Sequence, residues 1–99
     1  MTVEEVEALF DKFNEEDEYL EFERIENPRS KRPDLHAFLV LDELLPAKEK
    51  QDVIGGASHD EIYLAFDLES LAPVATPEIV RDLVRCGVRY DSDGLCMFV

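Results

Sequence analysis

The closing stretch VRYDSDGLCMFV, from Val88 to Val99, decides the fold class of this chain. Two short apolar runs flank a bend that contains aspartate and glycine, and this pattern predicts a C-terminal β-hairpin over residues 88–99. The hairpin is antiparallel, while the chain before it mixes helices and strands. We therefore expect an α+β fold, with about three helices packed on one face of a small, partly antiparallel sheet. The 99 residues suit a single domain, 1–99.

A helix and a strand are predicted immediately before the hairpin. Thr76 is placed to cap a helix that has Pro77 at its first position and Gly87 as its C-terminal stop. Apolar and polar residues alternate over Ile62–Leu68, which is typical of a strand. Asp67–Leu71 can then form a short helical turn.

The middle of the chain predicts another helix, from Pro33 to Leu45, closed by Pro46. Its run Ala37–Leu41 is apolar on every side, so we expect this helix to be the buried centre of the fold. After a polar stretch, Gly55-Gly56 is expected to end this region flexibly.

The N-terminal region begins with a capping box, formed by Thr2 and Glu5, and predicts a helix that ends near Asn14. Its apolar stripe has helical spacing. The period then changes, and the alternation over Tyr19–Ile25 predicts a strand. The alternative interpretation continues the helix to about Leu20.

Charge is the strongest global feature. The chain carries 24 acids and 10 bases, a net charge of −14. Residues 1–26, the acidic N-terminal third, hold eleven acids against Lys12 and Arg24. Phosphate backbones and anionic membrane surfaces repel such a protein, so direct nucleic-acid or membrane binding is not expected. A basic protein partner is favoured, chiefly through faster encounter at low salt.

The candidate catalytic and metal motifs have simpler explanations. Ser58-His59-Asp60 contains the residue types of a catalytic triad, but neighbouring side chains diverge, and a polar loop explains the trio better. His36 is expected to be a solvated or helix-end histidine. Asp91-x-Asp93-Gly94 resembles part of a calcium loop but is better explained as a hairpin turn. We therefore predict no enzyme activity, catalytic residue, cofactor or metal.

The acidic segment Phe13–Glu26 has three interpretations. It is a solvated face that aids solubility, a docking surface for a basic protein, or a nucleic-acid mimic. In the docking interpretation, Tyr19 and Phe22 supply aromatic anchors. The predicted partner-binding residues are Glu15, Glu16, Asp17, Glu18, Tyr19, Glu21 and Glu23. The basic island that follows, Asn27–Pro33, either pairs with the acidic segment or contacts a partner.

Residues 33–99 also resemble a group of phage proteins. The segments PDLHAFLVLDELLP, HDEIYLAFDLESLA and DLVRCGVRYDSDGLCMFV are similar to small, mostly uncharacterised proteins encoded by tailed phages and prophages. The resemblance implies a host-takeover or regulatory protein that acts by binding, and it transfers no functional residue. The acidic N-terminal third lies outside it.

The sequence thus favours a cytoplasmic, non-enzymatic interaction module. It would act as an inhibitor or regulator that docks on a basic, nucleic-acid-binding host protein. A structural or assembly protein, or a homodimer whose charge serves solubility, is the first alternative. A small ligand-binding or catalytic domain around His59 is the second.

Overall fold

The computed structural model describes residues 1–92 and 94–98, over which the chain forms four α-helices and four β-strands. The short α3 makes the helix count four rather than the expected three. The elements are α1 (Val3–Glu15), η1 (Phe22–Arg24), α2 (Pro33–Leu44), β1 (Ile54–Ser58), β2 (Glu61–Asp67), α3 (Leu68–Leu71), η2 (Ala72–Val74), α4 (Pro77–Arg85), β3 (Val88–Asp91) and β4 (Gly94–Phe98). Asp93 and Val99, both in the predicted hairpin, lie outside the described residues.

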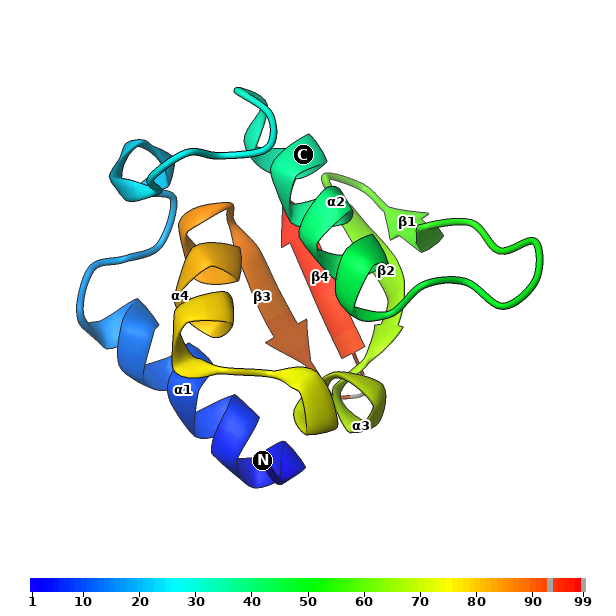
Figure 1. The fold of residues 1–99 in the computed structure, drawn as a ribbon, viewed down its shortest axis with the longest axis horizontal. Coiled ribbons are helices and arrows are strands. Elements are labelled where there is room, and N and C mark those ends of the chain that lie inside the picture. Colours follow the sequence, from blue (N-terminus) through cyan, green and yellow to red (C-terminus); the bar gives the residue numbers. More distant parts are fainter. Residues whose placement is uncertain (93, 99) are drawn as a thin grey trace.

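The four strands form one antiparallel sheet in the order β1-β2-β4-β3 (Figure 1). The α+β prediction is therefore confirmed, as are the strand at β2 and the C-terminal hairpin. β1 was not expected, and the prediction that Gly55-Gly56 is a flexible end is wrong. This edge strand is held by backbone pairing with β2. Its side chains do not alternate between apolar and polar, so the sequence pattern did not predict it.

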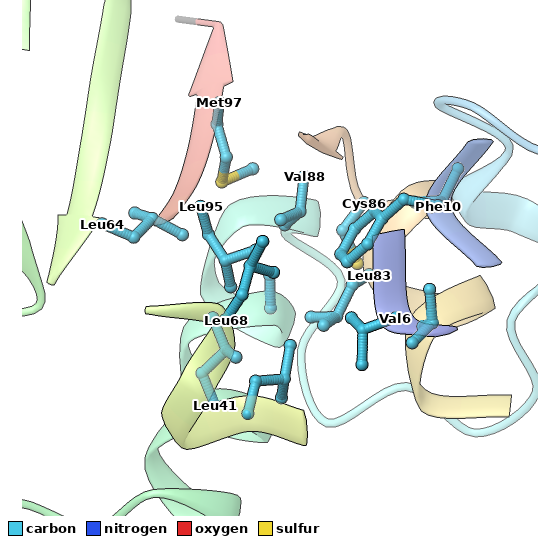
Figure 2. Close-up of a cluster of buried hydrophobic side chains, with 14 of the residues drawn as sticks. Val6, Phe10, Leu41, Leu64, Leu68, Leu83, Cys86, Val88, Leu95 and Met97 are labelled. Carbon is cyan, nitrogen blue, oxygen red and sulfur yellow. The ribbon is translucent and has the colours of Figure 1, made fainter. Parts of the chain in front are cut away.

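The core lies between one face of the sheet and the helices. Leu64, Leu95 and Met97 from the sheet converge with Phe10 of α1 and Leu83 of α4 (Figure 2). α1 and α4 lie side by side, as Figure 1 shows. This arrangement leaves the second face of the sheet outside the core.

The helix at α1 begins as the capping box predicts. The Glu5 backbone N–H donates to the Thr2 hydroxyl at 3.1 Å, and the Thr2 N–H donates to the Glu5 carboxylate at 2.9 Å. The central helix α2 is also confirmed, but its burial on every side is wrong. Ala37 and Leu41 are buried, whereas Leu39 is 37% exposed, because only one side of α2 meets the rest of the protein.

The strand predicted over Tyr19–Ile25 is also wrong. The segment forms turns and the short η1, and Leu20 adopts a φ of +63°, which lies outside the strand region. Its backbone N–H donates to the Val84 carbonyl at the end of α4, at 3.2 Å. Turn bonds within the segment, such as that from the Arg24 N–H to the Glu21 carbonyl, and this bond to a helix terminus take the place of a strand's ladder.

Gly87 forms the turn after α4, beside Leu20. Its φ of +94° is a conformation that side chains other than glycine rarely adopt. A Cβ atom at this position would lie 2.8 Å from Cδ2 of Leu20. The turn after α4 therefore requires glycine, whereas the exposed Leu20 side chain can rotate away from an added Cβ.

We expect Gly87→Ala to lower the free energy of unfolding by about 1–3 kcal/mol, chiefly because alanine is strained at this positive φ. Urea denaturation measures the change. Adding Leu20→Ala to this variant removes the contact but not the backbone strain, so it should restore only part of the loss. Unchanged stability in Gly87→Ala would contradict this account.

Candidate functional site

The acidic N-terminal third is displayed on the surface. Ten of its eleven acids are exposed or half-buried, and Glu18 is the exception. On α1, Glu4, Asp11 and Glu15 are exposed at helical spacing and share one face. This stripe leads into the segment Glu15–Glu23, which we call the acidic loop and which holds all the predicted partner-binding residues.

Glu18 is an internal anchor. Only 8% exposed, it receives a hydrogen bond from Nη1 of Arg24 at 2.5 Å and another from Nη2 of Arg85 at 2.8 Å. Arg85 also donates to the Arg24 carbonyl at 3.3 Å. Two arginines of this chain thus occupy the Glu18 carboxylate, and we do not count it among the residues free to bind a partner.

The same contacts control the ionisation of Glu18. Burial by itself would raise the pKa of this carboxyl, but the hydrogen bonds from Arg24 and Arg85 outweigh it and hold the pKa below its usual value. The carboxylate is therefore charged when the ion network forms. Its contribution to stability is present above a pH of about 4.5 and is lost as the pH falls through the lowered pKa.

The exposure of Tyr19 and Leu20 is the reverse of what the sequence suggests. Tyr19 is half-buried and packs against the core cluster. Leu20 is 60% exposed and is held in the left-handed region of backbone conformation, which is unusual for a branched, bulky residue. The exposed apolar side chain of the acidic loop is therefore Leu20. The alternating pattern gave no sign of this, because a strand at this position would have turned Leu20 inward.

Three neighbouring carboxylates lie where negative charge is unfavourable; they belong to Glu15, Glu16 and Asp17. They lie at the C-terminal end of α1, where the helix dipole is negative and cations are stabilising. All three are exposed, and none forms an ion pair within residues 1–92 and 94–98. A cation bound here from outside would therefore reduce the repulsion among these three carboxylates.

The remaining predicted residues flank this group. Glu21 is half-buried, and its carboxylate lies 3.9 Å from Nε of Arg24. Glu23 is exposed on η1. The structure thus brings Glu15, Glu16, Asp17, Leu20 and Glu23 to the surface of one short loop.

The basic island does not pair with the acidic segment, within the part of the chain that is described. Arg29 forms an ion pair with Glu43 of α2. The Arg29 backbone N–H donates to Nδ1 of His36 at 3.0 Å, so His36 fastens this loop to the start of α2. His36 is at a helix end as expected, but the solvated state is wrong, because the ring is buried against Phe22. Burial lowers the pKa of His36, and the nearby Asp82 offsets this only in part.

The other candidate motifs lie in a turn and in the core. Ser58 ends β1, and His59 and Asp60 form the turn to β2, with His59 exposed. Cys86 and Cys96 are buried free thiols, and burial raises their pKa values to about 12 and about 11. Neutral thiols are weak nucleophiles and weak metal ligands. Among the residues with described positions, no cluster of three or more His, Cys, Asp or Glu is arranged to hold a metal ion.

Comparison of the chain with protein-family models, with curated proteins and with solved structures gave no match. The resemblance to phage proteins therefore stays a prediction. Across the described ranges, each helix is too short or too polar to cross a bilayer.

We expect Glu18→Gln to lower the free energy of unfolding by about 1–3 kcal/mol, because a neutral amide cannot hold two arginines by charge-assisted hydrogen bonds. Glu23→Gln, in the same loop, is the matched control and should change it by less than about 0.5 kcal/mol. Urea denaturation at pH 7 measures both. Equal losses in the two variants would show that Glu18 is not an anchor.

Stability should also fall as the pH is lowered from about 7.5 to 5.5. The pKa of His36 is lower in the folded state than its usual 6.5, so the unfolded chain takes up a proton first. His36→Gln should flatten this slope. Thermal unfolding at several pH values tests this, and an unaltered slope in His36→Gln would refute it.

Proposed function

We propose that this chain is a non-enzymatic interaction module whose acidic loop binds a cationic protein. The observation that carries the proposal is the exposed, conformationally strained Leu20 beside the carboxylates of Glu15, Glu16 and Asp17. Non-glycine residues in such conformations cluster at binding and catalytic sites. Charge would speed the encounter, and the leucine would add the apolar contact on which most binding energy depends.

The anchor at Glu18 supports this proposal by limiting the cost of binding. The loop is tied to α4 through the ion pair of Glu18 with Arg85 and the backbone bond from Leu20 to Val84. A loop already fixed loses little conformational entropy when a partner binds. The phage resemblance would make that partner a host protein. If the partner binds nucleic acid through the same basic surface, the acidic loop would compete with that nucleic acid.

A synthetic peptide of lysines around one central leucine serves as the test ligand, followed by ¹⁵N–¹H shift titration of this protein. We expect amide shifts centred on residues 15–23, and an affinity at least tenfold lower in 500 mM than in 50 mM NaCl, because exposed charges are screened. The triple variant Glu15→Lys, Glu16→Lys, Asp17→Lys should abolish binding. The control Glu49→Lys, Asp52→Lys, Glu69→Lys makes the same charge change at exposed positions elsewhere. If both triple variants lose affinity equally, only the net charge matters, and the proposal is wrong.

The apolar part of the site is tested by Leu20→Ser. This change should weaken binding of the leucine-containing peptide about tenfold, which corresponds to ~1.4 kcal/mol. Its effect on a peptide with serine in place of leucine should be small. If Leu20→Ser leaves both affinities unchanged, Leu20 is not a contact residue.

A further inference from the structure

A cavity of about 280 Å³ lies between the loop after η1, the helix α2 and the helix α4. The loop lines it with four residues of the range 25–29, α2 with four of the range 36–44, and α4 with Ile79 and Asp82. We call it the His36 cavity, after the most buried of its polar residues. Typical ligand pockets measure roughly 300–1,000 Å³, so this cavity suits a small ligand.

His36 has a hydrogen-bond donor that the protein does not use. The residue is only 5% exposed, and its Nδ1 accepts the Arg29 backbone N–H at 3.0 Å. A neutral imidazole carries its proton on the nitrogen that does not accept, so Nε2 is a donor. Nε2 is buried, and no group in residues 1–92 and 94–98 accepts from it. Because a buried donor without a partner costs stability, a ligand that accepts from Nε2 would recover a hydrogen bond.

The charged groups around the cavity favour a cation. Its lining carries the carboxylates of Glu26, Glu43 and Asp82 against the guanidinium of Arg29, which pairs with Glu43. Nη1 of Arg85, outside the lining, lies 3.8 Å from Asp82. Even with Arg85 counted, three carboxylates face two cations. Within the described chain, Glu26 is exposed and forms no ion pair, so the site attracts one further positive charge and repels anions.

The rest of the wall is largely aliphatic. Ile25 is buried, and Val40, Leu44 and Ile79 are half-buried around the same cavity. An aliphatic group that enters would remove apolar surface from water, which favours binding. The cavity therefore selects for three features in one small molecule: a positive charge, a hydrogen-bond acceptor and an aliphatic body.

We propose that the His36 cavity binds a small primary ammonium compound that also carries a carbonyl group and an aliphatic side chain. The ammonium group lies near Glu26 and Asp82, the carbonyl oxygen accepts from Nε2 of His36, and the aliphatic group packs on Ile25 and Val40. Nε2 lies within the cavity wall, so lining side chains turn aside to admit the acceptor, as side chains commonly do on binding.

Two sources supply this chemistry. The amide of an aliphatic amino acid carries all three groups, and so does the first residue of a peptide whose amino terminus is free. Neither depends on the acidic loop, because that loop ends at Glu23 and the lining of the cavity begins at Ile25. Binding of the lysine peptide can therefore fail while this proposal holds, and the reverse is also true.

Leucinamide is the test ligand, added to about 100 mM at pH 7 and followed by ¹⁵N–¹H shift titration. We expect saturable shifts confined to residues 25–29, 36–44 and 79–82, with a Kd on the order of 1 mM because the ligand is small. Two analogues each lack one group: isoamylamine has no carbonyl, and N-acetyl-leucinamide has no charge. Each should bind about fivefold more weakly than leucinamide.

Two substitutions assign the contacts. His36→Asn keeps an oxygen that can accept from the Arg29 N–H but removes the Nε2 donor, so it should weaken leucinamide about fivefold and leave isoamylamine unchanged. Glu26→Gln removes the exposed carboxylate and should weaken both amines about threefold, without effect on N-acetyl-leucinamide. The control Glu49→Gln makes the same change at an exposed residue outside the lining and should alter none of these affinities.

If the spectrum of His36→Asn shows that it does not fold, the analogues and Glu26→Gln decide the matter. Equal affinities of leucinamide and both analogues would overturn the proposal. So would shifts centred on residues 15–23, or the lack of any saturable shift.

A leucyl-glycyl-glycinamide peptide with a free amino terminus separates the two sources. Tighter binding than that of leucinamide, with shifts at the same residues, assigns the cavity to the amino terminus of a polypeptide. Binding no tighter than that of leucinamide assigns it to a free small molecule.

Discussion

The Glu18 carboxylate ties the segment that follows α1 to the end of α4. It lies between Arg24 and Arg85, and Arg85 also reaches the Arg24 carbonyl. These contacts fasten the chain after α1 to the end of α4, beside the backbone bond from Leu20 to Val84. Because hydrogen bonds between charged groups are stronger when they are partly shielded from water, this network fixes the loop that ordinary surface ion pairs would leave free.

The residues around Glu18 shape the exposed surface of the acidic loop. Glu18 is turned inward, the neighbouring carboxylates are exposed at the negative end of α1, and Leu20 adopts a left-handed conformation beside Gly87. Each of these features costs stability locally. The helical packing of α1 on α4 offsets the cost, since Val6, Phe10, Val80 and Leu83 are almost fully buried. The scaffold is therefore able to present a loop that would not adopt this shape alone.

The acidic loop is anionic, and Leu20 is its exposed apolar residue. A protein with a net charge of −14 resists non-specific association with itself, because copies of it repel one another.

The sequence by itself determined the features that depend on neighbouring residues. These are the capping box at Thr2, the helices at α2 and α4, the glycine stop at Gly87, the strand at β2 and the C-terminal hairpin, because hydrophobic periods and capping side chains act locally. It also identified the acidic segment, although not which of its members are free. Tertiary structure alone decided that Glu18 is an anchor, that Leu20 rather than Tyr19 is exposed, and that Gly55-Gly56 joins the sheet. Each of these depends on a partner distant in sequence: Arg85, the end of α4, or β2. A linear pattern does not record such contacts, because they form only when the chain has folded.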